Sequence, residues 1–173
     1  MDCVSTVPKT SGVYALIFRL DAPLELRVGR LGRRTLPAGH LLYVGSAFGP
    51  GGLRARLARH LRAQKRIHWH IDALTSVLSP VACLCDASGR RLECSWAQRL
   101  AHLPDAFIPI PGFGSSDCRS GCAAHLIAFP PDSAPDLDAE LNPSLILTCH
   151  EYTRSNRNRS CSWGIASPKS GSQ

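Results

Sequence analysis

Tyr43, Arg56 and His60 are the first residues whose types and spacing suggest chemistry, because they lie together in one strongly basic segment. Residues 27–66 contain ten Arg or Lys residues and no Asp or Glu. Such a surface attracts a polyanion, since each cation placed near a phosphate releases a condensed counterion. A tyrosine, an arginine and a histidine at fixed spacing within this segment indicate chemistry on a phosphate. The plainer interpretation is a solvated basic face without a specific partner.

The composition of the whole chain favours nucleic acid as the partner. The 173 residues carry a formal net charge of +7, and 44% of them are hydrophobic, which suffices for a core. No run of about twenty apolar residues is present, so we expect no membrane span. Residues 1–3 do not begin a secretory signal. We therefore expect a cytoplasmic protein whose eight cysteines are thiols or metal ligands, without an obligate protein partner.

Short apolar runs predict the strands that would position these side chains. Residues 12–20 are rich in β-branched and aromatic types, and residues 40–44 follow turn chemistry at 37–39. We expect these two runs to pair antiparallel. The further predicted strands are residues 24–28, 81–85 and 125–129.

Three helices are predicted from residues that recur every fourth position. Leu53, Leu57 and Leu61 form the buried stripe of a helix over residues 53–63. His60 lies one turn beyond Arg56 on a neighbouring face, so the two side chains can approach the same point. The second predicted helix starts at His68 and ends near Leu78. The third starts at Leu92 and is ended by Pro104.

The composition changes near residue 132. Residues 1–132 are predicted to form one domain. Residues 133–173 are rich in Ser, Pro, Asp, Asn and Arg, with one apolar cluster at 145–147. We expect this tail to be disordered or loosely attached.

Several short motifs together resemble a known family. Residues 12–14 and 43–45 resemble the paired motif of the GIY-YIG nuclease superfamily. Arg56-x-x-Arg59-His60 resembles its catalytic helix, and Glu93 resembles its metal-binding glutamate. More specifically, the chain resembles the Uri-type branch, the DUF123 family, over about residues 11–130. The four motifs typical of that branch occur here at 42–47, 68–72, 112–118 and 122–126.

The resemblance implies both a fold and an activity. The fold would be of the α/β (α+β) class, with a small, mainly antiparallel, three-stranded central sheet flanked by helices. The activity would be that of a metal-dependent endonuclease, with DNA as the expected substrate and one Mg²⁺ or Mn²⁺ as cofactor. Its role would lie in repair, recombination or turnover of nucleic acid.

The resemblance also implies roles for individual residues. Tyr14 or Tyr43, or a water held by one of them, would act as the base. A tyrosine is a poor base at neutral pH unless nearby charges lower its pKa from about 10. Arg56 would stabilise negative charge on the phosphate, His60 would relay a proton, and Glu93 would hold the metal. The residues expected to contact substrate are Ser46, Arg59, His70, Ser116 and Asp117.

The chain departs from the superfamily pattern at one position. Many members place an asparagine late in the domain, whereas the first asparagine here is Asn142, beyond the expected domain end. Ser115, Ser116 or Asp117 would have to replace it. A non-catalytic nucleic-acid-binding module on the same fold is therefore the alternative function.

Structural roles compete with these assignments. The two tyrosines could simply pack on each other, and Glu93 could be a carboxylate favoured at a helix N-terminus. His68-x-His70-x-Asp72 suggests a metal site, but structural or substrate-orienting roles are favoured, and Asp72 could cap the helix or pair with an arginine.

A second metal is a further possibility. Cys118, Cys122 and His125 are ligand types that suit a structural Zn²⁺, with His70, Asp117 or Cys94 as the source of a fourth ligand. Buried thiols in a tight loop are the favoured alternative. A zinc-stabilised interaction protein is accordingly a third functional class.

Overall fold

The computed structural model describes residues 3–62, 64–133 and 135–148. Its strands are β1 (Gly12–Leu20), β2 (Leu24–Val28), β3 (Gly32–Leu36), β4 (Gly39–Ala47), β5 (Ala82–Asp86), β6 (Leu126–Phe129) and β7 (Leu145–Thr148). Its α-helices are α1 (Gly52–Leu61), α2 (His70–Thr75), α3 (Glu93–Ala101) and α4 (Leu137–Leu141), and 3₁₀ turns occur at Cys3–Thr6 and Gly29–Leu31. No helix in the described part is long and apolar enough to cross a membrane.

The central sheet has five strands in the order β6-β4-β1-β5-β7, and every neighbouring pair is antiparallel. β2 and β3 form a separate two-stranded sheet. The expectation of a three-stranded central sheet is therefore wrong, although the antiparallel pairing of the predicted strands 12–20 and 40–44 is confirmed. The sheet is wider because β6 adds beside β4 and β7 adds beside β5.

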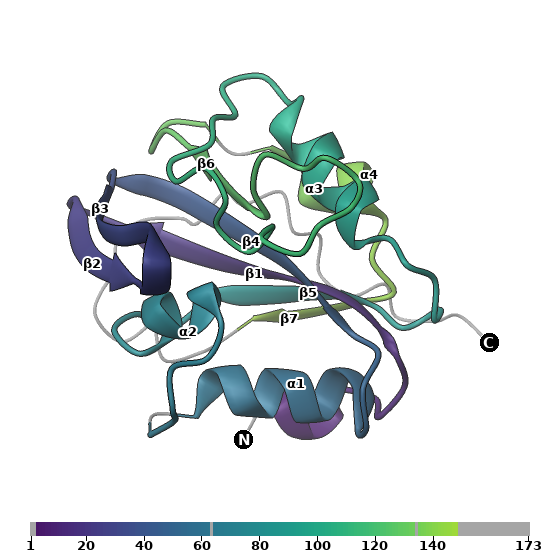
Figure 1. The fold of residues 1–173 in the computed structure, drawn as a ribbon. Helices are drawn as coiled ribbons and strands as arrows, with labels where there is room; N and C mark the ends of the chain where they lie inside the picture. The colour runs from purple at the N-terminus through teal and green to yellow at the C-terminus, as the bar shows by residue number, and fades with distance from the viewer. Residues whose placement is uncertain (1–2, 63, 134, 149–173) are drawn as a thin grey trace.

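The sheet is covered on both faces, as Figure 1 shows, with α1 and α2 on one side and α3 and α4 on the other. Alternate side chains of β1 therefore enter two different cores. Tyr14, Leu16 and Phe18 pack with residues of α1 and α2, whereas Val13 and Ile17 pack with residues of α3 and α4. Burial on both faces explains why β1 is an unbroken apolar run.

Part of the predicted tail belongs to this fold. Leu137 and Leu141 of α4 are buried in the second core, and β7 pairs with β5 in the register Cys85↔Leu145. The expectation of a loosely attached tail is therefore wrong for residues 135–148, because the apolar cluster at 145–147 completes a sheet edge. Residues 149–173 lie outside the described residues.

Two elements differ from the sequence prediction. The helix expected from His68 to Leu78 is shorter, since α2 ends at Thr75. β3 has no counterpart among the strands predicted from the sequence. Its residues Gly32–Leu36 include two arginines and are mostly exposed. Such a strand lacks the alternation of apolar and polar residues by which strands are recognised.

Candidate functional site

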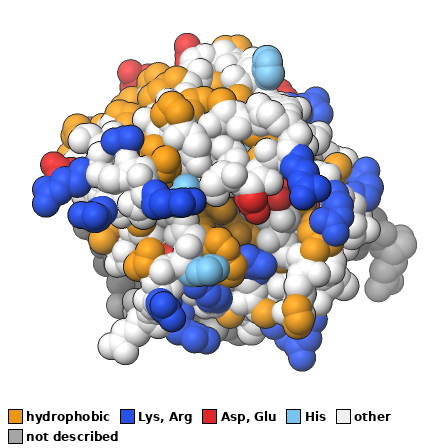
Figure 2. Space-filling view, in the orientation of Figure 1, with side chains coloured by type: hydrophobic (Ala, Val, Ile, Leu, Met, Phe, Trp, Pro, Cys, Tyr) orange, Lys and Arg blue, Asp and Glu red, His pale blue; other side chains and the backbone are white. Residues whose placement is uncertain are grey.

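A cleft of about 540 Å³ opens on the sheet face that carries α1 and α2. All the residues predicted to be catalytic line it: Tyr14, Tyr43, Arg56, His60 and Glu93. Four of the five predicted substrate contacts line it as well: Ser46, His70, Ser116 and Asp117. Figure 2 shows Lys and Arg side chains on both sides of the hollow at the centre of this view, with acidic side chains gathered beside it.

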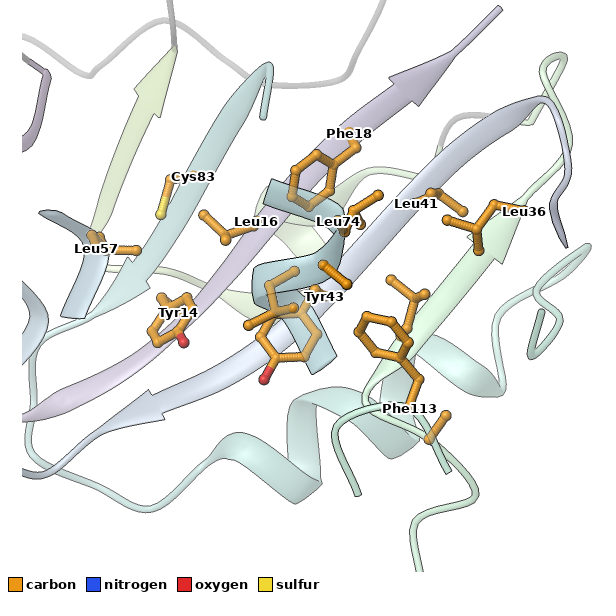
Figure 3. Packing of buried hydrophobic residues seen from close by; sticks show 14 of the residues in the cluster. Tyr14, Leu16, Phe18, Leu36, Leu41, Tyr43, Leu57, Leu74, Cys83 and Phe113 are labelled. Carbon is orange, nitrogen blue, oxygen red and sulfur yellow. The ribbon is translucent and has the colours of Figure 1, made fainter. Parts of the chain in front are cut away.

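Tyr14 and Tyr43 form one wall of the cleft. They project from β1 and β4 to the same side of the sheet, and Figure 3 shows their hydroxyl groups pointing the same way. Their ring centroids are 6.4 Å apart. Tyr14 lies across Gly45, its register partner, where a Cβ atom would collide with the tyrosine ring and hydroxyl. Burial raises the pKa of both tyrosines above the usual value of 10, so both are neutral at pH 7.

His60 connects Tyr14 to a buried carboxylate. Its Nε2 atom lies 2.7 Å from the Tyr14 hydroxyl, and its Nδ1 atom lies 3.3 Å from Oδ1 of Asp72. Burial lowers the pKa of His60 to about 4, even though Asp72 opposes this effect. The ring is therefore neutral at pH 7. Because the ionised Asp72 carboxylate can only accept a hydrogen bond, Nδ1 carries the ring proton and Nε2 accepts a hydrogen bond from the Tyr14 hydroxyl.

Asp72 organises the side of the cleft opposite the sheet. It is fully buried and accepts hydrogen bonds from Arg59 (2.8 Å), from the His68 amide and from the Trp69 amide (both 3.0 Å). Burial raises the pKa of Asp72, but these bonds outweigh it and lower the pKa to about 2. The prediction that Asp72 caps a helix or pairs with an arginine is confirmed.

The two arginines of α1 have different environments. Arg59 contacts both carboxylate oxygens of Asp72, at 2.8 and 3.0 Å, and does not line the cleft, so it does not stand where a substrate contact was expected. Arg56 lines the cleft and forms no ion pair with any described residue. Both guanidinium groups lie over the Trp69 ring, at 4.3 Å for Arg56 and 4.1 Å for Arg59. Trp69 thus holds Arg56 in place without an ion pair to a described carboxylate.

Glu93, the first residue of α3, stands at the other end of the cleft. Its Oε2 accepts a hydrogen bond of 2.6 Å from the Ser46 hydroxyl of β4, and its Oε1 lies 3.4 Å from Nδ1 of His125. Burial acts to raise its pKa, but His125, Ser46 and the charge of Arg56 together lower it. Glu93 is therefore an ionised carboxylate whose side chain is 28% exposed.

The loop over residues 112–125 closes the remaining side. The Gly114 amide donates a hydrogen bond of 3.0 Å to Nδ1 of His70. This bond supports a structural role for His70. His68, His70 and Asp72 are not gathered into a metal-binding group. Cys118, Cys122 and His125 are gathered, and Cys94 of α3 joins them.

Sequence reasoning missed some features of the cleft. The sequence did not predict that Asp72 would also contact His60. Trp69 packs against the core and also stacks with two arginines at the cleft wall, which the sequence did not predict. Arg91 also lines the cleft and lies 4.3 Å above the Phe48 ring. The three-residue spacing of Trp69 and Asp72 at the start of a helix was the sequence signal that could have indicated a capping role for Asp72.

Comparison with known proteins identifies one match. A family model described as "Domain of unknown function DUF123" matches residues 13–143. Searches of curated proteins and of solved structures find no match to the chain. The matched range extends from β1 to just beyond α4 and includes all the residues that line the cleft.

Proposed function

The chain belongs to the DUF123 family, and from its cleft we propose that it is a divalent-metal-dependent endonuclease that hydrolyses phosphodiester bonds in nucleic acid. DNA is the expected substrate, in repair, recombination or turnover. The proposal also includes the resemblance to the GIY-YIG superfamily. One observation carries it: Tyr14, Tyr43, Arg56, His60 and Glu93, far apart in the sequence, line a single cleft.

Arg56 suits the role of phosphate ligand. It forms no ion pair with any described carboxylate, and Trp69 restricts its position. A guanidinium held in this way is preorganised, so it would stabilise charge on the phosphate without moving when the substrate binds. Arg59 shows the contrast, since its charge is engaged by Asp72.

Tyr14, His60 and Asp72 suit the activation of a water molecule. Tyr14 stays neutral, so it would accept the water proton on its oxygen while passing its own proton to Nε2 of His60. Asp72 would stabilise the resulting imidazolium. The water oxygen would form a bond to phosphorus as the bond from phosphorus to the leaving sugar oxygen breaks.

Glu93 suits a hard divalent cation. Its carboxylate is ionised, partly exposed to the cleft and oriented by Ser46. Mg²⁺ and Mn²⁺ keep several waters and need only one or two protein carboxylates. Glu93 would hold such a cation, which would supply positive charge near the leaving oxygen.

A cytoplasmic location is part of the proposal. None of the five cysteines whose state the structure describes forms a disulfide, which suits a reducing compartment. We propose nucleic acid as the partner in that compartment.

Cleavage of a labelled panel tests the proposal. Single-stranded, duplex, flap and junction DNA, and RNA, are incubated with the full chain and Mg²⁺ or Mn²⁺. We expect Glu93→Gln and Arg56→Ala each to lower the cleavage rate by about 100-fold or more. The matched controls are Glu25→Gln, whose side chain is 59% exposed on β2, and Arg99→Ala, whose side chain is 61% exposed on α3. Both controls should cut at the wild-type rate.

The alternative function is a non-catalytic nucleic-acid-binding module. It is favoured by the cleft lining, which contains no asparagine among the described residues; Asn142 caps the end of α4 and does not line the cleft. In that case no substrate is cut with either metal, and Glu93→Gln binds nucleic acid as well as the wild type or more tightly. Binding without cleavage across the whole panel rejects the endonuclease.

A further inference from the structure

Four potential metal ligands meet beside the cleft from separate parts of the chain. Cys94 lies in the first turn of α3, Cys118 and Cys122 lie in the loop over residues 112–125, and His125 precedes β6. Their ligand atoms all lie within 4.8 Å of one another. No other group of three such side chains comes this close within the part of the chain that the structure describes.

The sulfur positions fit a tetrahedral ion. A Zn–S distance of about 2.3 Å places two sulfur ligands about 3.8 Å apart. The Sγ atoms of Cys94 and Cys118 are 3.6 Å apart, close to that value and far from the roughly 2.0 Å of a disulfide. Three cysteine sulfurs and one imidazole nitrogen are a common ligand set of four-coordinate structural zinc sites. Thiolate ligands disfavour Mg²⁺.

His125 supplies an independent observation. Its side chain is 4% exposed, and its buried Nε2 atom has no hydrogen-bond partner among the described residues. A buried polar side chain without such a partner costs free energy, so a ligand is the natural explanation. Nδ1 faces Glu93 at 3.4 Å, which leaves Nε2 to bind a metal. A carboxylate beside the second nitrogen commonly orients a metal-bound histidine.

We propose that Cys94, Cys118, Cys122 and His125 bind one structural Zn²⁺. Binding replaces the protons of the three thiols, which are released to solvent. The ion ties the start of α3 to the loop that carries Ser116 and Asp117, and so holds one rim of the cleft. This proposal does not depend on the proposed endonuclease activity.

Metal analysis of the full chain tests the proposal. The protein is produced in zinc-supplemented medium and purified without chelators, and its metals are measured by mass spectrometry after gel filtration. We expect about one zinc per chain, falling at least about fivefold in Cys118→Ser and Cys122→Ser. The matched control is Cys83→Ala, because Cys83 is a buried thiol of β5 outside the cluster. It should retain the wild-type zinc content.

A measurement on the wild type covers the case in which the ligand variants do not fold. Removing zinc with a chelator should make the three cluster thiols reactive to a thiol reagent, and adding zinc back should protect them. Co²⁺ in place of Zn²⁺ should give the intense visible absorption of a tetrahedral thiolate site. Purified protein with no zinc, with iron instead, or with a Cys94–Cys118 disulfide overturns the proposal.

Discussion

At the scale of single residues, the cleft depends on Asp72. This fully buried carboxylate contacts Arg59 and His60. It also accepts hydrogen bonds from two backbone amides at the start of α2. Through His60 it also sets the environment of the Tyr14 hydroxyl. One side chain therefore stabilises the start of α2 and also holds His60 in contact with the Tyr14 hydroxyl.

Asp72→Asn should destabilise the protein by about 2–4 kcal/mol, because it leaves Arg59 partly buried without its counter-charge. Urea unfolding followed by circular dichroism measures the loss. Asp21→Asn is the matched control, since Asp21 pairs with Arg19 but its side chain is 70% exposed. Its effect should stay within about 0.5 kcal/mol. Equal effects of the two variants would contradict this account.

The free energy of unfolding should fall as the pH falls from about 6.5 to about 2. The folded pKa of His60, about 4, lies below the ordinary 6.5, so the unfolded chain binds more protons between these values. The pKa of Asp72, about 2 against 3.8, acts in the same direction at lower pH. Tyr14, Arg56 and Arg59 are the other titratable or charged groups that surround His60.

Urea unfolding at pH 7 and pH 4.5 measures this dependence. Burial lowers the pKa of His40 and His70 too, so they contribute in the same direction. The share of His60 is the part of the stability difference that His60→Asn removes, on the order of 1–3 kcal/mol. An unchanged difference in that variant would show that His60 is not the group responsible.

At the scale of elements, the close pairing of β1 and β4 places the tyrosines. Gly45 is opposite Tyr14 in the register, and its missing side chain makes room for the ring. Gly114, in a backbone conformation with φ +74°, gives similar room beside the Tyr43 ring. Two glycines thus let two aromatic rings line one cleft.

Gly45→Ala should destabilise the protein by about 1–3 kcal/mol and displace Tyr14 from His60, because the new Cβ meets the ring. Thermal unfolding checks the stability, and the Tyr14–His60 contact can be followed by the NMR shifts of His60. Gly49→Ala provides the comparison, since a Cβ there meets nothing within 4 Å. A melting temperature equal to that of the control would contradict the predicted clash.

At the scale of the whole molecule, two cores on opposite faces of the sheet combine segments that are distant in the sequence. The core on the α3 and α4 side includes Leu137 and Leu141 of α4, and Ile146 of β7 packs against it. Leu137 is 1% exposed within it. The domain thus extends beyond residue 132, consistent with the family match to residue 143.

Leu137→Ala should cost about 2–5 kcal/mol of unfolding free energy, because it opens a cavity in this core. Val77→Ala is the control, as Val77 is 60% exposed, and it should change stability by less than about 0.5 kcal/mol. Denaturant unfolding of both variants distinguishes an integral α4 from a loosely attached one. In the latter case Leu137→Ala would behave like the control.

The sequence by itself determined the family, most strand positions and the residues that line the cleft. Apolar runs such as residues 12–20 indicate buried strands without knowledge of the tertiary structure. The order of the four family motifs can likewise be read directly from the sequence. The match to DUF123 confirms the predicted membership in that family. The catalytic roles of these residues stay predictions.

Only the tertiary structure decided which of several equivalent side chains occupy the site. Arg56 and Arg59 are the same residue type three positions apart, and Asp72 from another helix engages only Arg59. Cys94 joins the cysteine cluster because α3 begins beside the loop over residues 112–125. β7 joins the sheet because β5 offers an open edge. Each choice depends on contacts between segments distant in sequence, which local patterns do not encode.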